Sequence, residues 1–511
     1  MLLIPAVAFL LVAPADESPC PMPAKVSPDG HFLLDQSGKP YFYLADTAWE
    51  LFHRLDRDQA VKYLETRRRQ GFTAIQAVAI AEVDGHSAAN PYGHLPLVDL
   101  DPARPAVMDG PANDYWDHVD FIVEEANRRG LAIGFLPTWG RYWRDPVRDG
   151  KPIFTPENAD AYGEWLGRRY EDKAIVWILG GDRPVENDTH RAIIRAMARG
   201  LRKGDGGRHL ITFHPPGANG SSTWFHDEDW LDFNMRQNGH ANEFSGRYSK
   251  TRDDHDRRPA RPVIDGEPIY EDHPVSFDAK KHGHSIAADV RRALYWDLFG
   301  GACGHTYGHH SVWQMWQPDR APINNPLMPW TEAIEQPGAN QMIHGRRLIE
   351  SRPILSRIPD DSVIVADRVA TSVPGAGIYR FAATRDRDGS YAMVYAHRSD
   401  VYGPHGVIAG RPWPPGGSTP GPARRRSASS PARAADNSRR PTRARRSDWV
   451  LVLDDKAKGY PPPGRSRPAL EGPGHTRPRA GPYHGGRVDG TRPRRGSPCV
   501  SDASAPGFCC P

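Results

Sequence analysis

The chain has 511 residues, of which 38% are hydrophobic and 9% aromatic, so it can bury a large core and is not disordered throughout. Five Cys are too few for a disulfide scaffold. The net charge of +4 is uneven, because residues 401–511 hold 20 Lys and Arg against 7 Asp and Glu, which leaves residues 1–400 at −9. Binding to nucleic acid would depend on that last segment alone, and we expect none.

The N-terminus predicts an export signal. The apolar run from Leu2 to Val12 is too short to cross a bilayer, and Ala13-Pro14-Ala15 fits a small-x-small cleavage site. We therefore expect residues 1–15 to be a signal peptide and the protein to be secreted or periplasmic, with no stable membrane span. The usual basic start of a signal is missing, which a start codon placed too far downstream would explain. The alternative is a hydrophobic N-terminal strand.

Residues 25–355 alternate short apolar runs with helical patterns. Eight runs have the near-continuous apolar content of parallel strands buried on both faces. They are Tyr41–Ala45, Ala74–Ala79, Ala132–Thr138, Ala174–Leu179, Leu210–His214, Asp232–Arg236, Pro262–Asp265 and Cys303–Tyr307. The expected helices include Tyr115–Arg129, one that begins at Thr155-Pro156, one capped by Asp188 and closed by Gly204, and Ile286–Phe299.

Eight strand–helix units predict an α/β fold, a (β/α)₈ TIM barrel. A doubly wound sheet is the alternative, but no candidate strand leads into a Gly-x-Gly-x-x-Gly turn or a Walker loop.

The chain changes character after the barrel. Residues 361–400 contain alternating segments at Ser362–Ala366, Gly377–Ala382 and Tyr391–Tyr395, with Arg387-Asp388-Gly389 as a hairpin turn, and they predict the start of a C-terminal β-sandwich. Residues 401–511 contain 18 Arg, 19 Pro and 16 Gly. We expect a mostly disordered basic tail, or the product of a GC-rich gene translated out of frame. One strand at residues 448–455 interrupts it, and we expect this strand to join the partial sheet or to lie unsupported.

The ends of the predicted strands carry the candidate site, because barrel enzymes act at the carboxyl ends of their strands. Carboxylates, amides, imidazoles and Trp gather there, and this mixture is typical of carbohydrate binding. The predicted substrate-binding residues are Asp46, Trp49, Trp139, His214, Asn238, His305 and Tyr307. We expect no cofactor and no metal, because His305, His309 and His310 lack a carboxylate at a characteristic spacing.

Two carboxylates stand out at these strand ends. Asp182 follows Gly180-Gly181, and Glu267 follows Asp265-Gly266. Glycoside hydrolysis needs one carboxylic acid to protonate the leaving oxygen and one carboxylate to attack or to activate water. The structural alternatives are a loop-fixing or helix-capping role for Asp182 and an arginine-paired role for Glu267.

Three segments resemble motifs of glycoside hydrolase family 140, the apiosidase-like enzymes. They are Leu44–Phe52, Trp177–Asp182 and Val263–Pro268, and the resemblance covers about residues 25–395. It implies a retaining hydrolase with Asp182 as acid/base and Glu267 as nucleophile, which removes apiose from plant pectin. It also implies that the barrel precedes a β-sandwich described as a collagen-binding domain, whose final strand the segment around Trp449 resembles.

Two other functions stay open at this stage. One is a non-catalytic carbohydrate-binding or adhesion protein on a barrel scaffold. The other is an exo- or endo-glycosidase of different specificity.

Overall fold

The computed structural model describes residues 19–108, 110, 114–241, 245–364, 380–397 and 448–465. The expectations for a signal peptide at residues 1–15 and for residues 401–447 and 466–511 therefore lie outside the described residues. Within the described part of the chain, no helix combines the length and the apolar character needed to cross a membrane.

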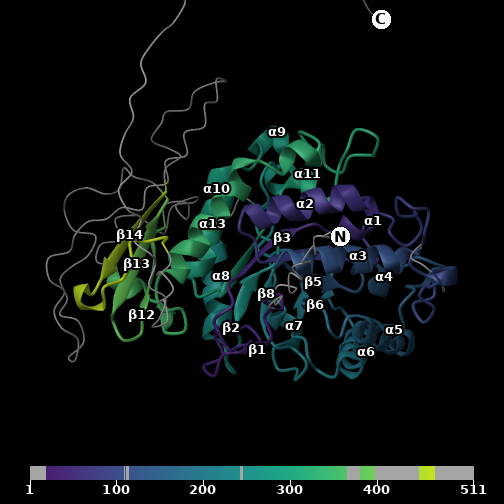
Figure 1. Ribbon diagram of the computed structural model, residues 1–511, viewed down its shortest axis with the longest axis horizontal. Coiled ribbons are helices and arrows are strands. Elements are labelled where there is room, and N and C mark those ends of the chain that lie inside the picture. Colours follow the sequence, from purple (N-terminus) through teal and green to yellow (C-terminus); the bar gives the residue numbers. More distant parts are fainter. Residues whose placement is uncertain are drawn as a thin grey trace, which may run out of the picture. The chain divides into compact units, whose positions relative to one another are not determined.

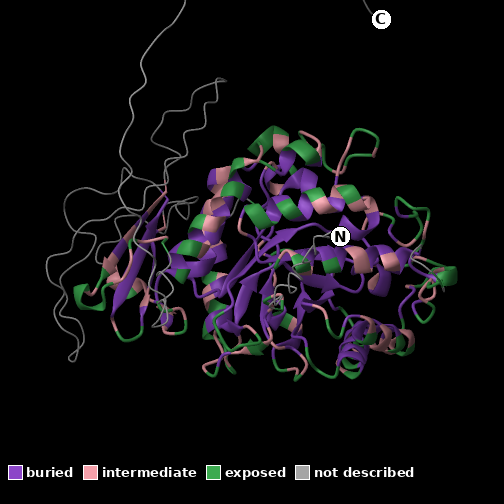
Figure 2. Cartoon of the chain, in the orientation of Figure 1, coloured by how far each residue is buried: buried purple, intermediate pink, exposed green. Residues whose placement is uncertain are grey.

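Eight parallel strands form a nearly closed barrel, preceded by a short hairpin of β1 (Lys25–Val26) and β2 (Leu33–Leu34), as Figure 1 shows. Neighbouring strands follow the order β7-β6-β5-β4-β3-β10-β9-β8. They are β3 (Tyr43–Thr47), β4 (Ala74–Val78), β5 (Ala132–Leu136), β6 (Ile175–Gly180), β7 (Ile211–His214), β8 (Asn234–Arg236), β9 (Val263–Asp265) and β10 (Gly304–Tyr307). The predicted TIM barrel is confirmed, and every residue of these eight strands is buried (Figure 2).

The barrel is closed between β7 and β8 by bonds outside a regular ladder. The Asp232 N–H donates to the Ile211 carbonyl at 2.9 Å, and the Thr212 hydroxyl donates to the Phe233 carbonyl at 2.7 Å. These bonds satisfy backbone groups where the two strands do not pair continuously.

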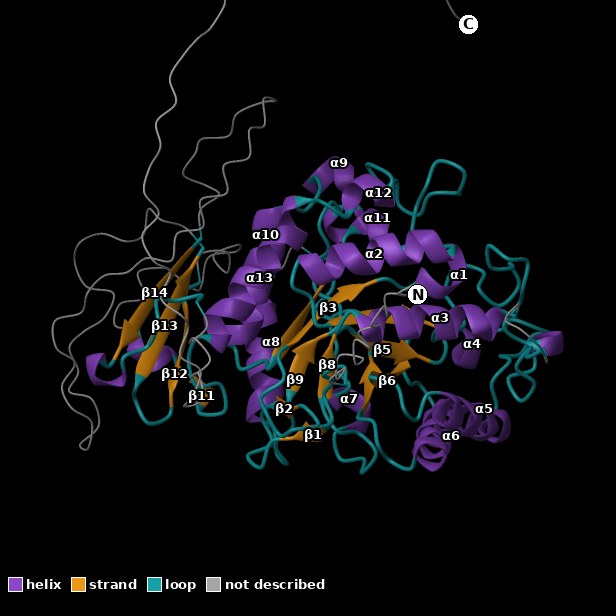
Figure 3. Cartoon of the chain, viewed as in Figure 1, coloured by secondary structure: helices purple, strands orange, loops and turns teal. Residues whose placement is uncertain are grey.

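The helices surround this barrel, as the colouring of Figure 3 makes clear. Their bounds are α1 (Leu51–Arg54), α2 (Arg57–Arg69), α3 (Tyr115–Arg128), α4 (Arg141–Arg144), α5 (Pro156–Arg169), α6 (Asp188–Asp205), α7 (Ser222–Phe225), α8 (Ser245–Asp256), α9 (Ala279–His282), α10 (Ala287–Phe299), α11 (His310–Trp313), α12 (Trp330–Ala333) and α13 (Pro337–Glu350). Thr155 caps α5, with Pro156 in its first turn, as the sequence predicts.

Helix α6 corrects two sequence expectations. Asn187 rather than Asp188 caps it, by accepting the His190 N–H at 2.9 Å. The helix continues past Gly204 and ends before Gly206, which has a left-handed φ of 65°. Gly204 lies inside the helix because α5 packs closely there: a Cβ on Gly204 would come within 2.3 Å of the Glu164 carbonyl oxygen. Its missing side chain serves helix packing and not helix termination.

A four-stranded antiparallel sheet follows the barrel. Its order is β11 (Arg357–Pro359), β12 (Ala382–Asp386), β13 (Tyr391–Ala396) and β14 (Trp449–Asp454). The predicted hairpin turn is present, with Gly389 at a φ of 82°. The isolated strand predicted at 448–455 joins this sheet and pairs with β13 over its whole length. The segment expected as a strand at 362–366 instead begins with a 3₁₀ turn, and residues 365–379 lie outside the described ranges.

Side chains of this sheet contact the helices of the barrel. Tyr395 stacks on Tyr295 of α10 with ring centroids 4.7 Å apart. Arg291 of α10 pairs with Asp448 at 2.7 Å, and Arg352 makes two bonds to Asp454 at 2.6 and 2.7 Å. Strand β14, which is separated from β13 by 52 residues of sequence, is therefore held by its neighbours in the sheet and by the barrel.

Asp46, a predicted substrate-binding residue, lies on β3. Its side chain is fully buried and faces α2, where the Arg67 Nε donates to its Oδ2 at 2.7 Å and the Tyr63 hydroxyl donates to the same oxygen. Arg67 also donates to the Ile334 carbonyl at 2.9 Å. Asp46 therefore ties a barrel strand to the helix layer and has no surface to offer a ligand.

Replacement of Asp46 tests this structural role. Asp46→Asn leaves the buried Arg67 cation without its counter-charge, so we expect a loss of about 3–5 kcal/mol in the free energy of unfolding. Thermal or denaturant unfolding measures the loss. The control is Asp99→Asn, because Asp99 pairs with Arg104 at the surface, where such pairs contribute at most about 1 kcal/mol. Equal stability of the two variants would contradict the assignment.

Candidate active site

The turn after β6 places Asp182 under backbone strain. Gly180, Gly181 and Asp182 have φ values of 93°, 98° and 56°, three successive residues in the left-handed region. A Cβ on Gly180 would lie 2.5 Å from the His214 carbonyl oxygen, and one on Gly181 would lie 2.7 Å from the Gly140 nitrogen. Glycines at 180 and 181 are therefore required, and an Asp forced into this conformation is a feature of functional sites.

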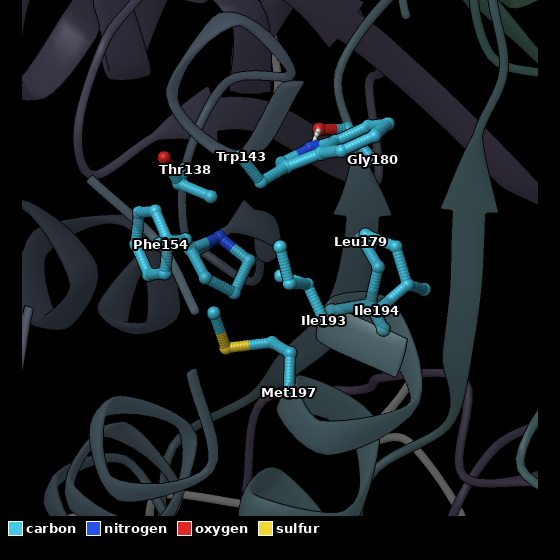
Figure 4. Close-up of a pocket in the computed structure, with 9 residues that line it drawn as sticks. Thr138, Trp143, Phe154, Leu179, Gly180, Ile193, Ile194 and Met197 are labelled. Carbon is cyan, nitrogen blue, oxygen red and sulfur yellow. Dashed lines mark hydrogen bonds between the residues drawn. The ribbon is translucent and has the colours of Figure 1, made fainter. Parts of the chain in front are cut away.

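A small apolar cavity lies beside this turn, and Figure 4 shows the side chains that line it. Its volume is about 10 Å³, space for one water molecule at most, and its lining is mainly Trp143, Phe154, Leu179, Ile193, Ile194 and Met197. The indole N–H of Trp143 donates to the Gly180 carbonyl at 2.9 Å (Figure 4). The cavity lies between α4, α6 and the ends of β5 and β6, and the side chains that line it support the turn.

Glu267 is held as a buried anion just after β9. Its Oε1 lies 3.0 Å from Nε2 of His240, and its Oε2 lies 3.1 Å from Nε2 of His214. Burial alone would raise the pKa of Glu267, but these two imidazoles outweigh burial and hold it well below its usual range. Glu267 is therefore ionised at neutral pH.

His214 connects the two carboxylate positions. The Asp182 backbone N–H donates to Nδ1 of His214 at 3.3 Å. In the neutral ring, the proton must then be on Nε2, which faces Glu267. Asp182 and Glu267 thus flank one imidazole. The sequence-predicted pair is brought together at one edge of the barrel, with His214 between its members.

The pKa of Asp182 is shifted in the opposite direction to that of Glu267. Burial first, and then the negative charge of Glu267, raise the pKa of Asp182, whereas His214 and Arg183 oppose this rise. The Asp182 side chain retains 32% exposure, against 9% for Glu267. One carboxyl group thus has a raised pKa and is reachable from solvent, and the other is a buried anion.

Aromatic rings and open hydrogen-bonding positions surround this pair. The ring centroid of Trp49 lies 5.3 Å from both Trp139 and His214, and its indole N–H donates to the Tyr270 hydroxyl at 3.2 Å. Several buried polar atoms in this region have no hydrogen-bond partner among the described residues. They are Trp139 Nε1, Gln237 Oε1 and Asn238 Oδ1. Such atoms are the positions that substrate hydroxyls would fill.

His305 and Tyr307, two of the predicted substrate-binding residues, have partners in the helices and the loop after β9. His305 is fully buried and bonds Asp297 of α10 at 3.0 Å. Tyr307 is fully buried and donates to Glu271 at 2.6 Å, and Glu271 in turn accepts the N–H of Gly338 on α13. Alternate residues of a strand point to opposite sides, and these two residues of β10 both face the helices.

Asn238 is half-buried and donates to Asp265 at 2.8 Å, directly beside the Glu267 turn. The histidines that follow His305 have separate partners, because His309 lies 3.2 Å from Asp272 and His310 bonds the Asn324 carbonyl. Within the described ranges, no group of three His, Cys, Asp or Glu residues is placed to hold a metal ion.

Five residues near the site were not selected from the sequence: Glu82, Gln237, His240, Tyr270 and Phe277. The position of Gln237 and His240 just after β8 is a usable signal, but nothing in the sequence separates them from their neighbours. Tyr270 lies beside Glu267 and bonds Trp49. Phe277 lies in a loop whose path sequence periodicity does not predict.

The chain matches the family model "Apiosidase-like, catalytic domain" over residues 27–356. One similar solved structure, described as a glycoside hydrolase, is 35% identical, with 73% of this chain and 83% of that chain covered and a TM-score of 0.66. Another is described as a glycoside hydrolase family 5 from Bacteroides vulgatus ATCC 8482, with 34% identity, coverage of 74% and 81%, and the same TM-score. No curated protein matches the chain significantly. With its barrel and its paired carboxyl groups, the chain belongs to the apiosidase-like family and is a glycoside hydrolase.

Proposed function

We propose that the enzyme hydrolyses its substrate with retention of configuration. Glu267 attacks the anomeric carbon while Asp182 donates its proton to the glycosidic oxygen, so that the aglycone leaves and a glycosyl–Glu267 ester forms. Asp182, now ionised, takes a proton from water, which attacks the same carbon and releases Glu267. The observation that carries this proposal is the opposite shift of two neighbouring carboxyl groups, because the pKa of Glu267 is lowered and that of Asp182 is raised, while His214 contacts the Glu267 carboxylate and the Asp182 backbone N–H.

For the substrate, we propose apiose linked to plant pectic glycans, acted on outside the cytoplasm in a secreted or periplasmic location. Support for the sugar comes from the family's description, and support for the location comes from the apolar segment and small-residue motif at residues 1–15. Activity on a panel of aryl glycosides and on an apiose-containing pectic oligosaccharide tests the substrate. Hydrolysis of other glycosides but not apiosides would indicate a different glycosidase, and binding without hydrolysis would indicate a carbohydrate-binding protein.

Loss of the acid and loss of the nucleophile should change the dependence of activity on pH and on the leaving group in different ways. In Asp182→Ala we expect about a 10²–10⁴-fold loss of kcat/KM on substrates with a poor leaving group and a much smaller loss with dinitrophenolate. The alkaline limb of the wild-type pH profile, set by the raised pKa of Asp182, should disappear with the activated substrate. Steady-state kinetics from pH 4 to 9 measures both effects, and an unchanged alkaline limb would reject Asp182 as the acid.

Replacement of the nucleophile gives a different pattern. Glu267→Ala should abolish turnover of poor and good leaving groups alike, because bond formation at the anomeric carbon is lost in both. Proton NMR of the first product formed by the wild-type enzyme should show retained configuration. An inverted product would contradict the covalent mechanism and would make Glu267 a base for water.

Phe277 is expected to contribute a binding surface for the sugar chain. Its side chain is 63% exposed although it lies 4.9 Å from the His273 ring and 5.8 Å from the His240 ring that contacts Glu267. Phe277→Ala should raise KM about five- to tenfold, the equivalent of about 1–1.4 kcal/mol of lost stacking, with little change in kcat. The control is Leu355→Ala, which removes an exposed apolar side chain after α13. Equal KM values for the two variants would exclude this role.

A further inference from the structure

The loop that follows β4 holds a third carboxyl group, Glu82, in a fixed position. Three hydrogen bonds anchor the backbone of this loop. The backbone N–H of Trp139 donates to the Ile80 carbonyl at 3.2 Å, and the Tyr142 hydroxyl donates to the Ala81 carbonyl at 2.7 Å. The Val83 N–H donates to the Glu50 carboxylate at 2.9 Å. The Glu82 side chain remains 28% exposed. Among the described residues its carboxyl group makes no hydrogen bond, so a fixed loop presents a free polar group.

The cation Arg183 contacts three carboxyl groups, one of which is that of Glu82. The Arg183 guanidinium lies 4.0 Å from Glu82, 3.3 Å from Asp145 and 3.1 Å from Asp182. Glu50 and Glu267 add further negative charge, although His53 also contacts Glu50. Burial, followed by the charges of Asp182, Glu50 and Glu267, raises the pKa of Glu82 to about 8 against the opposing effect of Arg183. This raised pKa favours the protonated carboxyl group of Glu82 at neutral pH, a form that can donate an O–H hydrogen bond.

We propose that Glu82 is a further substrate-contacting residue, a neutral carboxylic acid that donates a hydrogen bond to a hydroxyl of the departing sugar. This inference rests on the proposed function, because it assigns Glu82 to the side of the site where Asp182 protonates the leaving oxygen. Arg183 links Glu82 to Asp182, because its guanidinium lies 4.0 Å from the Glu82 carboxyl group and 3.1 Å from that of Asp182. In this arrangement Glu82 contributes to the recognition of a leaving group that bears hydroxyls.

Thermal unfolding tests the protonation state of Glu82 without any substrate. The folded protein keeps the proton of Glu82 up to about pH 8, whereas an unfolded Glu loses it near pH 4.3. Wild-type stability should therefore fall relative to Glu82→Gln as pH rises from about 4.5 to 8, and the difference should then level off. Asp84→Asn is the matched control, because it changes an exposed carboxylate to an amide in the same loop. A Tm difference between Glu82→Gln and wild type that is independent of pH would overturn the neutral assignment.

Kinetics on two substrates tests the contact itself. On an oligosaccharide substrate, Glu82→Ala should lower kcat/KM about five- to tenfold, which corresponds to one lost hydrogen bond. On an aryl glycoside of the same sugar, whose leaving group lacks hydroxyls, the change should be less than about twofold. Glu82→Gln keeps a neutral donor, so at pH 6 it should retain activity on the oligosaccharide. Its ratio to wild type should rise above pH 8, where wild type loses its donor.

Three outcomes would overturn the proposal. If Glu82→Ala hydrolysed the oligosaccharide at the wild-type rate, Glu82 would not contact the substrate. If the variant lost equal activity on both substrates, Glu82 would position the site in general and would not recognise the leaving group. A Glu82→Gln variant as impaired as Glu82→Ala at pH 6 would show that the ionised form is needed. Failure of the proposed function looks different, since wild type itself would then hydrolyse neither substrate.

Discussion

The contact of buried Glu267 with two imidazoles determines the chemistry of this site. A carboxylate removed from water would ordinarily take up a proton, because charge is costly in a low-dielectric environment. His240 and His214 reverse this tendency, each with Nε2 about 3 Å from one oxygen of Glu267. Burial and the anion they maintain then raise the pKa of Asp182. The same electrostatic arrangement thus shifts the pKa values of the two carboxyl groups in opposite directions, as the proposed roles of acid and nucleophile require.

The orientation of His214 depends on the strained turn after β6. The ring is fixed because the Asp182 N–H points at Nδ1, and that direction requires the left-handed backbone at residues 180–182. Such strain persists only where the surroundings over-determine it. Here the supports are the Trp143 bond to Gly180 and the bonds that join Gly181 to Gly140 and His214. The apolar packing of α4–α6 is therefore part of what places Asp182.

The sequence predicts the barrel well because each strand is a short apolar run bounded by turn residues. All eight strands lie within about two residues of their expected bounds, and both carboxylates lie where strand ends meet. Strand ends alone do not foretell the partners of Asp46, His305 and Tyr307. A strand end specifies the edge of the barrel, but only the alternation of side chains decides between its interior and the helix layer. His305 and Tyr307 share one parity on β10 and both bond groups held by helices.

Site residues that lie deep in a loop cannot be predicted from the ends of the strands. Glu82 lies four positions beyond β4, and its importance comes from groups that approach it from other loops, chiefly Glu50, Asp182 and Arg183. Such convergence follows from the closed barrel and leaves no local trace in the sequence. It also means that Asp182 and Glu82 titrate in a shared field, with one guanidinium between them. The loss of a proton from either therefore makes loss from the other harder.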